Sequence, residues 1–395
     1  MTAIARLPGH RFLHSPGPSR VPDDVLHAMS RQPMDLADPR VDRCINACEV
    51  GLKRLLHTEH DVFLYAANGH GAWEAVIANL VAPGAKVLIA GTGHFSESWA
   101  VQTEAMGGVV IRTPWVEGLP INAADLETAL RADASHEIAA VFAVHTDTAS
   151  GVTSDLAALR AAIDRAGHPA LFVVDVVASL GATEFEMDAL RADVALGACQ
   201  KGLMLPPGLA FVAVNAVAME RSRANPMPRF YWDWRLRQSE LSYRKFCGTP
   251  PQSLLAGLEA ALALIFREGE AQVLARHRHL ADAVHAAVAR WSEAGALSFF
   301  GQLPASRSVS VTTVLVDASV DPEAMREVAR ERFEVAIAGG LGALAGRAFR
   351  IGHLGDINAA MVLGALAGVE AAMTVQGVPF GRGGVEAAVA RLAAD

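Results

Sequence analysis

Cysteine is scarce in this sequence, with four residues in a chain of 395. Four thiols are too few for a disulfide framework. Their scarcity suits a reducing compartment, and we therefore expect a cytoplasmic protein. No stretch of about 18 uninterrupted apolar residues occurs, which argues against a membrane-spanning helix. The opening residues lack the apolar segment of a secretory signal, and the closing tripeptide is not a peroxisomal address.

Positive charge is not in excess either. The formal net charge is −8, so the chain shows neither the basic footprint of nucleic-acid binding nor a polybasic membrane patch. With 52% hydrophobic and 19% charged residues, the composition is that of a folded protein with a sizeable core. We therefore expect small-molecule ligands, and neither nucleic acid nor a membrane as a partner.

Strand-like and helix-like patterns alternate between about residues 60 and 215. Apolar, strand-like runs occupy residues 62–66, 86–90, 109–112, 139–145, 171–175, 194–198 and 210–215. Helix-like stretches between them cover residues 73–80, 96–105, 123–132 and 156–166. This alternation predicts an α/β fold with a mostly parallel central sheet covered by helices.

The pattern changes after residue 251. Two long amphipathic helices are predicted first, at residues 253–268 and 270–291. They are followed by a strand at 308–316, a helix at 322–333, a strand that runs into a loop at 345–355 and a closing helix at 359–374. We predict an N-terminal arm at residues 1–20, a large domain at 21–255 and a smaller α+β domain at 256–395.

An acid and a lysine stand at the ends of neighbouring predicted strands. Asp175 closes the run 171–175, and Lys201 follows the run 194–198. In open α/β sheets, ligands bind beyond the carboxyl ends of the strands. There an acid can keep a pyridine nitrogen protonated, and a lysine can form a Schiff base with an aldehyde. The pair is the minimal apparatus of an enzyme that uses pyridoxal 5'-phosphate (PLP).

Each of these two residues also has a structural interpretation. Asp175 could cap the segment that follows it, and Lys201 could be a solvated loop residue. The apolar flanks favour the functional interpretation, because a buried carboxylate needs a partner and burial lowers the pKa of a lysine. The neutral amine is the form that attacks an aldehyde.

A glycine-rich turn at residues 68–71 separates a predicted strand from a predicted helix. Glycines allow backbone N–H groups to approach an anion, and the start of a helix adds partial positive charge. The turn is a candidate phosphate cradle, although glycine-rich turns without such a role are common.

Seven motifs follow one another along the chain, at residues 16–22, 67–75, 145–152, 174–182, 199–211, 248–251 and 349–358. In this order they resemble the motifs of the class V aminotransferases, a branch of the fold-type I PLP enzymes. The resemblance is greatest to the serine–glyoxylate and alanine–glyoxylate aminotransferases. The resemblance runs almost from end to end, and it implies a fold-type I architecture, a PLP cofactor and a homodimer.

The resemblance also implies roles for residues around the cofactor. Gly69, His70 and Gln200 would contact the phosphate, and Phe95 would stack on the pyridine ring. Thr148 would bind the ring hydroxyl. Without the resemblance, Phe95 would be read as a core aromatic and Thr148 as a turn or helix cap.

Three further residues are assigned by the same resemblance. Thr249 would reach the phosphate of the neighbouring subunit, so that the active site needs a dimer. Arg350 would grip the α-carboxylate of the substrate, a geometry that a guanidinium suits. Gly17 would belong to a segment that closes over the substrate. The structural alternatives are a pairing of Arg350 with a structural acid and an ordinary loop at Gly17.

The sequence departs from the family pattern at two places. Phe246 stands where some relatives have a phosphate-binding tyrosine, and Thr146-Asp147 replaces a frequent Asn-Glu. The first change removes a hydroxyl, and the second shortens an acid beside the expected substrate. With these two changes, the resemblance does not determine which amino acid and 2-oxo acid are the substrates.

The predicted function is transfer of an amino group from a small amino acid, of the serine, alanine or aspartate type, to a 2-oxo acid, with glyoxylate as the expected acceptor. Lys201 would carry the cofactor and move the Cα proton, and Asp175 would hold the ring nitrogen protonated. A PLP lyase, desulfurase or hydrolase on the same fold is the main alternative. A dinucleotide-binding oxidoreductase is a second alternative, but it would need a G-x-G-x-x-G turn, and residues 69–71 do not fit that pattern. A non-catalytic binding protein on this fold is a third alternative, but it would have no need of Asp175, Lys201 and Arg350 together.

Overall fold

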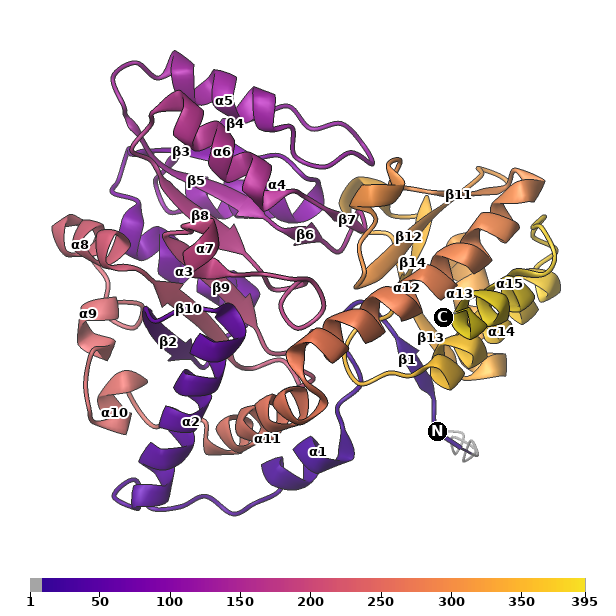
Figure 1. Cartoon of the computed structure of the whole chain (residues 1–395), viewed down its shortest axis with the longest axis horizontal. Helices are drawn as coiled ribbons and strands as arrows, with labels where there is room; N and C mark the ends of the chain where they lie inside the picture. Colours follow the sequence, from indigo (N-terminus) through magenta and orange to yellow (C-terminus); the bar gives the residue numbers. More distant parts are fainter. Residues whose placement is uncertain (1–8, 395) are drawn as a thin grey trace, which may run out of the picture.

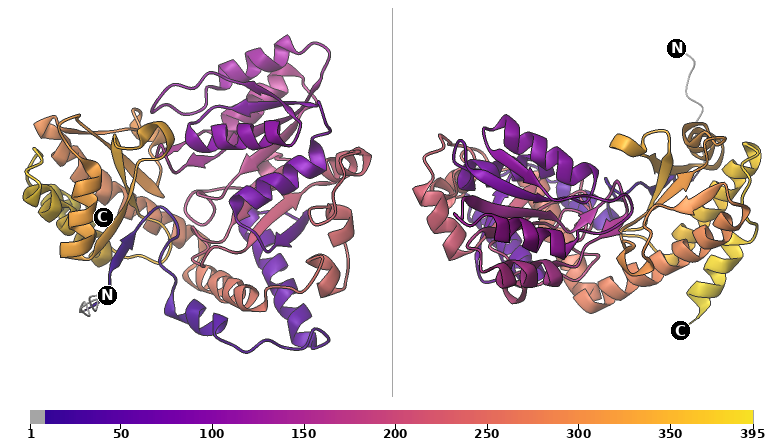
Figure 2. Two further views of the ribbon diagram at one scale, coloured as in Figure 1. Left: turned by 180° about the vertical axis from the view of Figure 1, so that it is seen from behind. Right: turned by 90° about the horizontal axis from the view of Figure 1, so that it is seen from above.

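The computed structural model describes residues 9–394, and the strands in that range form two main sheets and one short hairpin (Figure 1). The first eight residues of the predicted arm and Asp395 lie outside the described residues. The two sheets belong to two lobes that stand side by side, as both views in Figure 2 show.

The larger sheet has seven strands within residues 9–394. Their order is β2 (Asp61–Tyr65), β10 (Ala210–Val214), β9 (Val194–Ala198), β8 (Leu171–Asp175), β5 (Ile138–Val144), β3 (Lys86–Ala90) and β4 (Val109–Arg112). Strand β10 runs antiparallel to both of its neighbours, and the other pairs are parallel. The sheet is therefore mostly parallel, as the alternating pattern predicts.

Helices cover both faces of this sheet. The helices in this part of the chain are α1 (Asp23–Met29), α2 (Pro39–Leu56), α3 (Gly69–Leu80), α4 (His94–Ala105), α5 (Ala123–Ala132), α6 (Leu156–Ala166), α7 (Met187–Leu190), α8 (Ala216–Ala224), α9 (Trp234–Arg237), α10 (Ser242–Lys245) and α11 (Gln252–Glu268). Helices α2, α5, α6 and α11 share one hydrophobic core, and α3, α4 and α8 share another. Alternate residues of β8 enter opposite cores, because side chains alternate across a strand.

The smaller sheet has five strands among the described residues. Their order is β1 (Phe12–His14), β13 (Val335–Gly339), β14 (Ala348–Gly352), β12 (Val311–Val316) and β11 (Leu297–Phe299). A third core joins this sheet to α12 (Glu270–Trp291), α13 (Pro322–Phe333), α14 (Ala359–Val375) and α15 (Gly384–Ala393). No helix in the described range is both long enough and apolar enough to cross a membrane.

The N-terminal segment connects the two lobes. Strand β1 pairs in parallel with β13, so the first described strand belongs to the sheet that is otherwise built from the C-terminal part. Helix α11 packs with α1 and α2 in the core of the large sheet, whereas the core of the small sheet begins at Leu280 of α12. The predicted division near residue 255 stays a prediction.

Gly197 and Phe211 are direct partners across strands β9 and β10. A Cβ atom at Gly197 would overlap the Phe211 ring, so the ring occupies the space that glycine leaves open. The pair lies in a central part of the large sheet, close to the strand end that leads to Lys201.

We expect Gly197→Ala to destabilise the protein by about 1–3 kcal/mol, because the added methyl group overpacks the sheet. The measurement is the thermal unfolding midpoint followed by circular dichroism. The double variant Gly197→Ala/Phe211→Leu is the control, since a smaller side chain at 211 should restore part of the loss. A double variant that is less stable than both single variants would contradict this explanation.

Candidate active site

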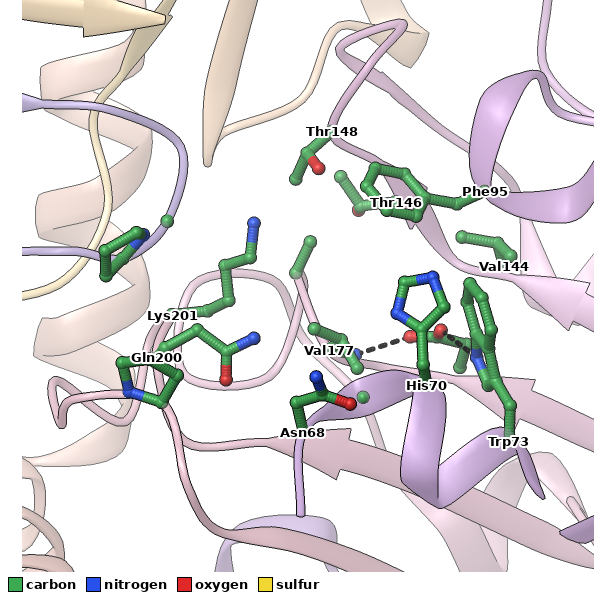
Figure 3. Close-up of a pocket in the computed structure, with 16 residues that line it drawn as sticks. Asn68, His70, Trp73, Phe95, Val144, Thr146, Thr148, Val177, Gln200 and Lys201 are labelled. Carbon is green, nitrogen blue, oxygen red and sulfur yellow. Dashed lines mark hydrogen bonds between the residues drawn. The ribbon is translucent and has the colours of Figure 1, made fainter. Parts of the chain in front are cut away.

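A cavity of about 250 Å³ lies beyond the carboxyl ends of strands β5, β8 and β9 (Figure 3). All of the predicted site residues except Thr249 and Arg350 line it: Gly17, Gly69, His70, Phe95, Thr148, Asp175, Gln200 and Lys201. This position agrees with the rule that α/β sheets bind ligands at the carboxyl ends of their strands.

Asp175 is the last residue of β8, and its carboxylate is buried. The backbone N–H of Val177 donates a hydrogen bond to Oδ1 at 2.7 Å, and Nε1 of Trp73 donates one to Oδ2 at 2.7 Å. Burial raises the pKa of Asp175 to about 6, and the two hydrogen bonds oppose that shift. The carboxylate is thus held in a fixed orientation with a pKa close to neutrality.

Lys201 follows β9, and its ammonium group is also buried. Its Nζ donates a hydrogen bond to the carbonyl oxygen of Pro16. Burial lowers the pKa of Lys201 to about 8, and the positive charge of Arg350 adds to this effect. The neutral amine is therefore accessible much closer to physiological pH than in a solvated lysine.

The N-terminal segment 16–19 lies directly over this lysine. The hydroxyl of Ser19 donates a hydrogen bond to the Lys201 carbonyl oxygen at 2.8 Å, and the Ser19 N–H donates one to the Gln200 carbonyl oxygen at 3.0 Å. Gly17 has a φ of +117°, and a Cβ atom there would lie 2.5 Å from Cε of Lys201. The backbone conformation favours glycine at this point, and a side chain there would displace the end of the Lys201 side chain.

The start of helix α3 provides the candidate phosphate cradle. Asn68 caps the helix, and its side chain accepts a hydrogen bond from the Gly71 N–H at 3.2 Å. The first N–H groups of the helix, at Gly69 and His70, have no carbonyl partner within it and can bind an anion. Gln200 also lines the cavity, and its amide NH2 group is a donor that can bind an anion.

Asp147 ties two walls of the cavity together. Its buried carboxylate accepts hydrogen bonds from the backbone N–H of Phe95 at 2.9 Å and of Ala149 at 2.8 Å. The first bond fixes the start of helix α4, which carries Phe95, and the second fixes the loop that carries Thr148. The shortened acid noted in the sequence is therefore a structural link between these two side chains.

Arg350 lies on β14 of the small sheet and is buried, yet it does not line the cavity. Its Nη1 donates a hydrogen bond to the Thr148 carbonyl oxygen at 2.9 Å, and its Nε donates one to the Gly339 carbonyl oxygen at 2.7 Å. Burial lowers the pKa of Arg350 to about 10, so the group stays charged at neutral pH. Arg350 thus links the two lobes beside the cavity.

Thr249 is exposed and is not among the residues that line the cavity. Phe246, at the position of the missing tyrosine, is buried in the core of the large sheet. Neither residue contributes to the cavity of its own chain.

Sequence reasoning missed the contribution of Trp73. Its hydrogen bond to Asp175 joins residues 102 positions apart, which no local pattern shows. The one available signal is its place four residues after Gly69, on the same side of helix α3.

The residues present fit PLP. An anion cradle, a buried acid and a buried amine of lowered pKa face one cavity, and Phe95 supplies an aromatic ring beside them. These are the groups that a phosphorylated pyridine aldehyde needs from a protein.

Comparisons with known proteins agree with this geometry. The family model "Aminotransferase class-V" matches residues 11–349. A serine–glyoxylate aminotransferase of Methylorubrum extorquens is 39% identical, over 98% of this chain and 97% of the relative. An L-aspartate–glyoxylate aminotransferase of Paracoccus denitrificans is also 39% identical, over 94% of each chain.

A solved structure gives the same result. The ureidoglycine–glyoxylate aminotransferase of Bacillus subtilis superposes with a TM-score of 0.88 at 27% identity, covering 98% of this chain and 99% of that one. Sequence and architecture are thus shared along almost the whole length. The chain belongs to the class V aminotransferase family, whose members are PLP-dependent enzymes of fold type I.

Proposed function

We propose that this protein transfers an amino group from a small amino acid, of the serine, alanine or aspartate type, to glyoxylate. The observation that carries the proposal is the pair Asp175 and Lys201, which face one cavity with pKa values moved toward neutrality. The acceptor is supported by the relatives described above, each of which is a glyoxylate aminotransferase by name.

The cavity walls suggest how PLP is held. The N–H groups at the start of α3 and the side chain of Gln200 would bind its phosphate, and Asp175 would pair with its ring nitrogen. Phe95 would lie on the ring, and Thr148 would bind the ring hydroxyl. When bound, PLP supplies an aldehyde that bonds to amines and a ring that accepts electrons from the substrate carbon.

Lys201 would carry out the proton transfers. As a buried amine of lowered pKa, it would accept the proton from the substrate Cα and hold it for return. Arg350 would hold the substrate carboxylate. Two backbone carbonyls fix its Nε and Nη1, and Nη2, which makes no hydrogen bond to residues 9–394, would donate to that carboxylate.

We also infer a homodimer with shared active sites. Thr249 is exposed, and large apolar side chains nearby in the chain are exposed as well: Phe230 at 70%, Leu241 at 60% and Tyr243 at 56%. Exposed apolar residues that gather in one segment are typical of an interface. A second copy of the chain would cover them and would receive Thr249 at its phosphate cradle.

The main alternative chemistry finds less support. A PLP-dependent desulfurase needs a cysteine near the reacting carbon, and no cysteine is among the described residues that line the cavity. Cys199 is buried, and burial raises its pKa to about 11.

For the location of the protein, we infer a reducing cytoplasm, because all four cysteines are free.

We expect Lys201→Ala to lower turnover by at least about 10²–10⁴-fold, the usual contribution of a positioned proton-transfer group, and to abolish the absorbance above roughly 400 nm that PLP gives when bonded to the lysine. The wild type is mixed with serine, alanine or aspartate, and the bleaching of this band is followed before glyoxylate is added. Lys86→Ala, at an exposed ion pair with Glu137 at the amino end of β3, is the matched control. Formation of pyruvate, ammonia or sulfide without a new amino acid would contradict transamination.

The rate at which the apoenzyme bonds PLP should rise with pH and level off above about 8, because the neutral Lys201 amine attacks the aldehyde. In Arg350→Gln the midpoint should move to higher pH, since a positive charge that disfavours the protonated amine has been removed. Stopped-flow absorbance at several pH values gives the midpoint for the wild type and for Arg350→Gln. A wild-type midpoint near the ordinary lysine value would show that the amine is not activated by burial.

Mixed dimers test the shared site. Chains carrying Lys201→Ala are combined with chains carrying Thr249→Glu, which places a negative charge where the partner's phosphate would bind. Activity should recover in the hybrid, because one of its sites then has both Lys201 and Thr249. If Thr249 served its own subunit, each site of the hybrid would keep one lesion and no activity would return.

A further inference from the structure

Trp73 makes a direct contact with the buried acid of the site. Its Nε1 donates a hydrogen bond to Oδ2 of Asp175 at 2.7 Å, while the Val177 N–H binds Oδ1 at 2.7 Å (Figure 3). A carboxylate with a donor on each oxygen cannot rotate without breaking one of the two bonds. Each oxygen still has a lone pair for one more partner.

The indole that donates this bond is itself held by other rings. Trp73 is buried and stacks on Trp99, with ring centroids 5.4 Å apart and planes 9° apart. Trp99 stacks in turn on Phe142 of strand β5, at 4.4 Å and 20°. The donor is therefore fixed by a column of rings that reaches the central sheet, and its N–H points in one direction.

Helix α3 brings this donor and the candidate phosphate cradle together. Its first residues, Gly69 and His70, offer the free N–H groups, and Trp73 lies one turn further on. The ring of His70 also lies against Trp73, with centroids 4.5 Å apart. One helix is thus placed to hold the cofactor phosphate by its backbone and to set the acid at the ring nitrogen by a side chain.

We propose that Trp73 is a positioning residue, which orients the Asp175 carboxylate toward the cofactor ring nitrogen and keeps that carboxylate ionised. The proposal rests on the proposed function, because it needs PLP in this cavity. It adds a residue for which the sequence motifs implied no role.

The surroundings of Asp175 explain why the hydrogen bond from Trp73 would keep its carboxylate ionised. Burial disfavours its ionised form, and the hydrogen bond from Trp73 is one of two that oppose this effect. Without that bond the pKa of Asp175 rises further, and more of the acid is neutral at neutral pH. A neutral acid pairs less strongly with a protonated ring nitrogen.

The molecule contains a matched control for this proposal. Trp99 is as deeply buried and belongs to the same stack, but its Nε1 has no hydrogen-bond partner among the described residues. Trp99→Phe therefore removes an indole without removing a bond to Asp175. A purely structural role of the stack would make the two substitutions alike.

The experiment is a titration of apoenzyme with PLP, and with the analogue in which a carbon atom replaces the ring nitrogen, followed by protein fluorescence. For Trp73→Phe we expect PLP affinity to fall by about tenfold or more, the effect of losing a hydrogen bond to a charged group. Affinity for the analogue should match that of the wild type, since it has no ring nitrogen to pair with Asp175. Trp99→Phe should change neither affinity by more than about twofold.

Two outcomes would overturn the proposal: equal losses for PLP and the analogue in Trp73→Phe, or PLP affinity unchanged in that variant. If Trp73→Phe does not fold, Trp73 is replaced by benzothienylalanine, which keeps the fused ring and lacks the N–H donor. The affinities of that variant for PLP and for the analogue are then compared with those of the wild type in the same way. A wild-type protein that binds no PLP would instead contradict the proposed function, so the two failures are distinguishable.

Discussion

The removal of water from around Asp175 and Lys201 is the constraint on which the rest of the site depends. A charged group away from water is unstable unless it is paired or changes its protonation state. Here burial raises the pKa of the acid to about 6 and lowers that of the lysine to about 8. Hydrogen bonds from Trp73 and Val177 orient the acid, and the hydrogen bond that Lys201 donates to the Pro16 carbonyl oxygen orients the amine.

The two lobes meet around this pair. Arg350 extends from the small sheet to the loop that carries Thr148, and its charge contributes to the lowered pKa of Lys201. The N-terminal segment leaves the small sheet after β1 and crosses over the lysine at Gly17. The electrostatic state of the lysine therefore depends on parts of the chain that are distant in sequence and joined by packing.

Most of the large sheet could be predicted from the sequence because each strand is a short apolar run between turns. The run 171–175 coincides with β8, and the helix predicted at 123–132 coincides with α5. Strand β1 could not be predicted, since three residues carry no periodicity and become a strand only by pairing with β13. Strand β13 was missed for a similar reason, because its VAIAG sequence does not differ from a helical apolar segment.

For the site, the sequence by itself determined the chemical groups: an acid and a lysine at strand ends, a glycine turn before a helix, and the motifs that carry the family resemblance. These are local features, and the chemistry of each follows from neighbouring residues. Only the tertiary structure decided which groups meet. It placed Trp73 on Asp175, put Asp147 between Phe95 and Thr148, and left Thr249 on the surface. Such contacts depend on packing between distant elements, and packing is a property of the whole fold rather than of any segment.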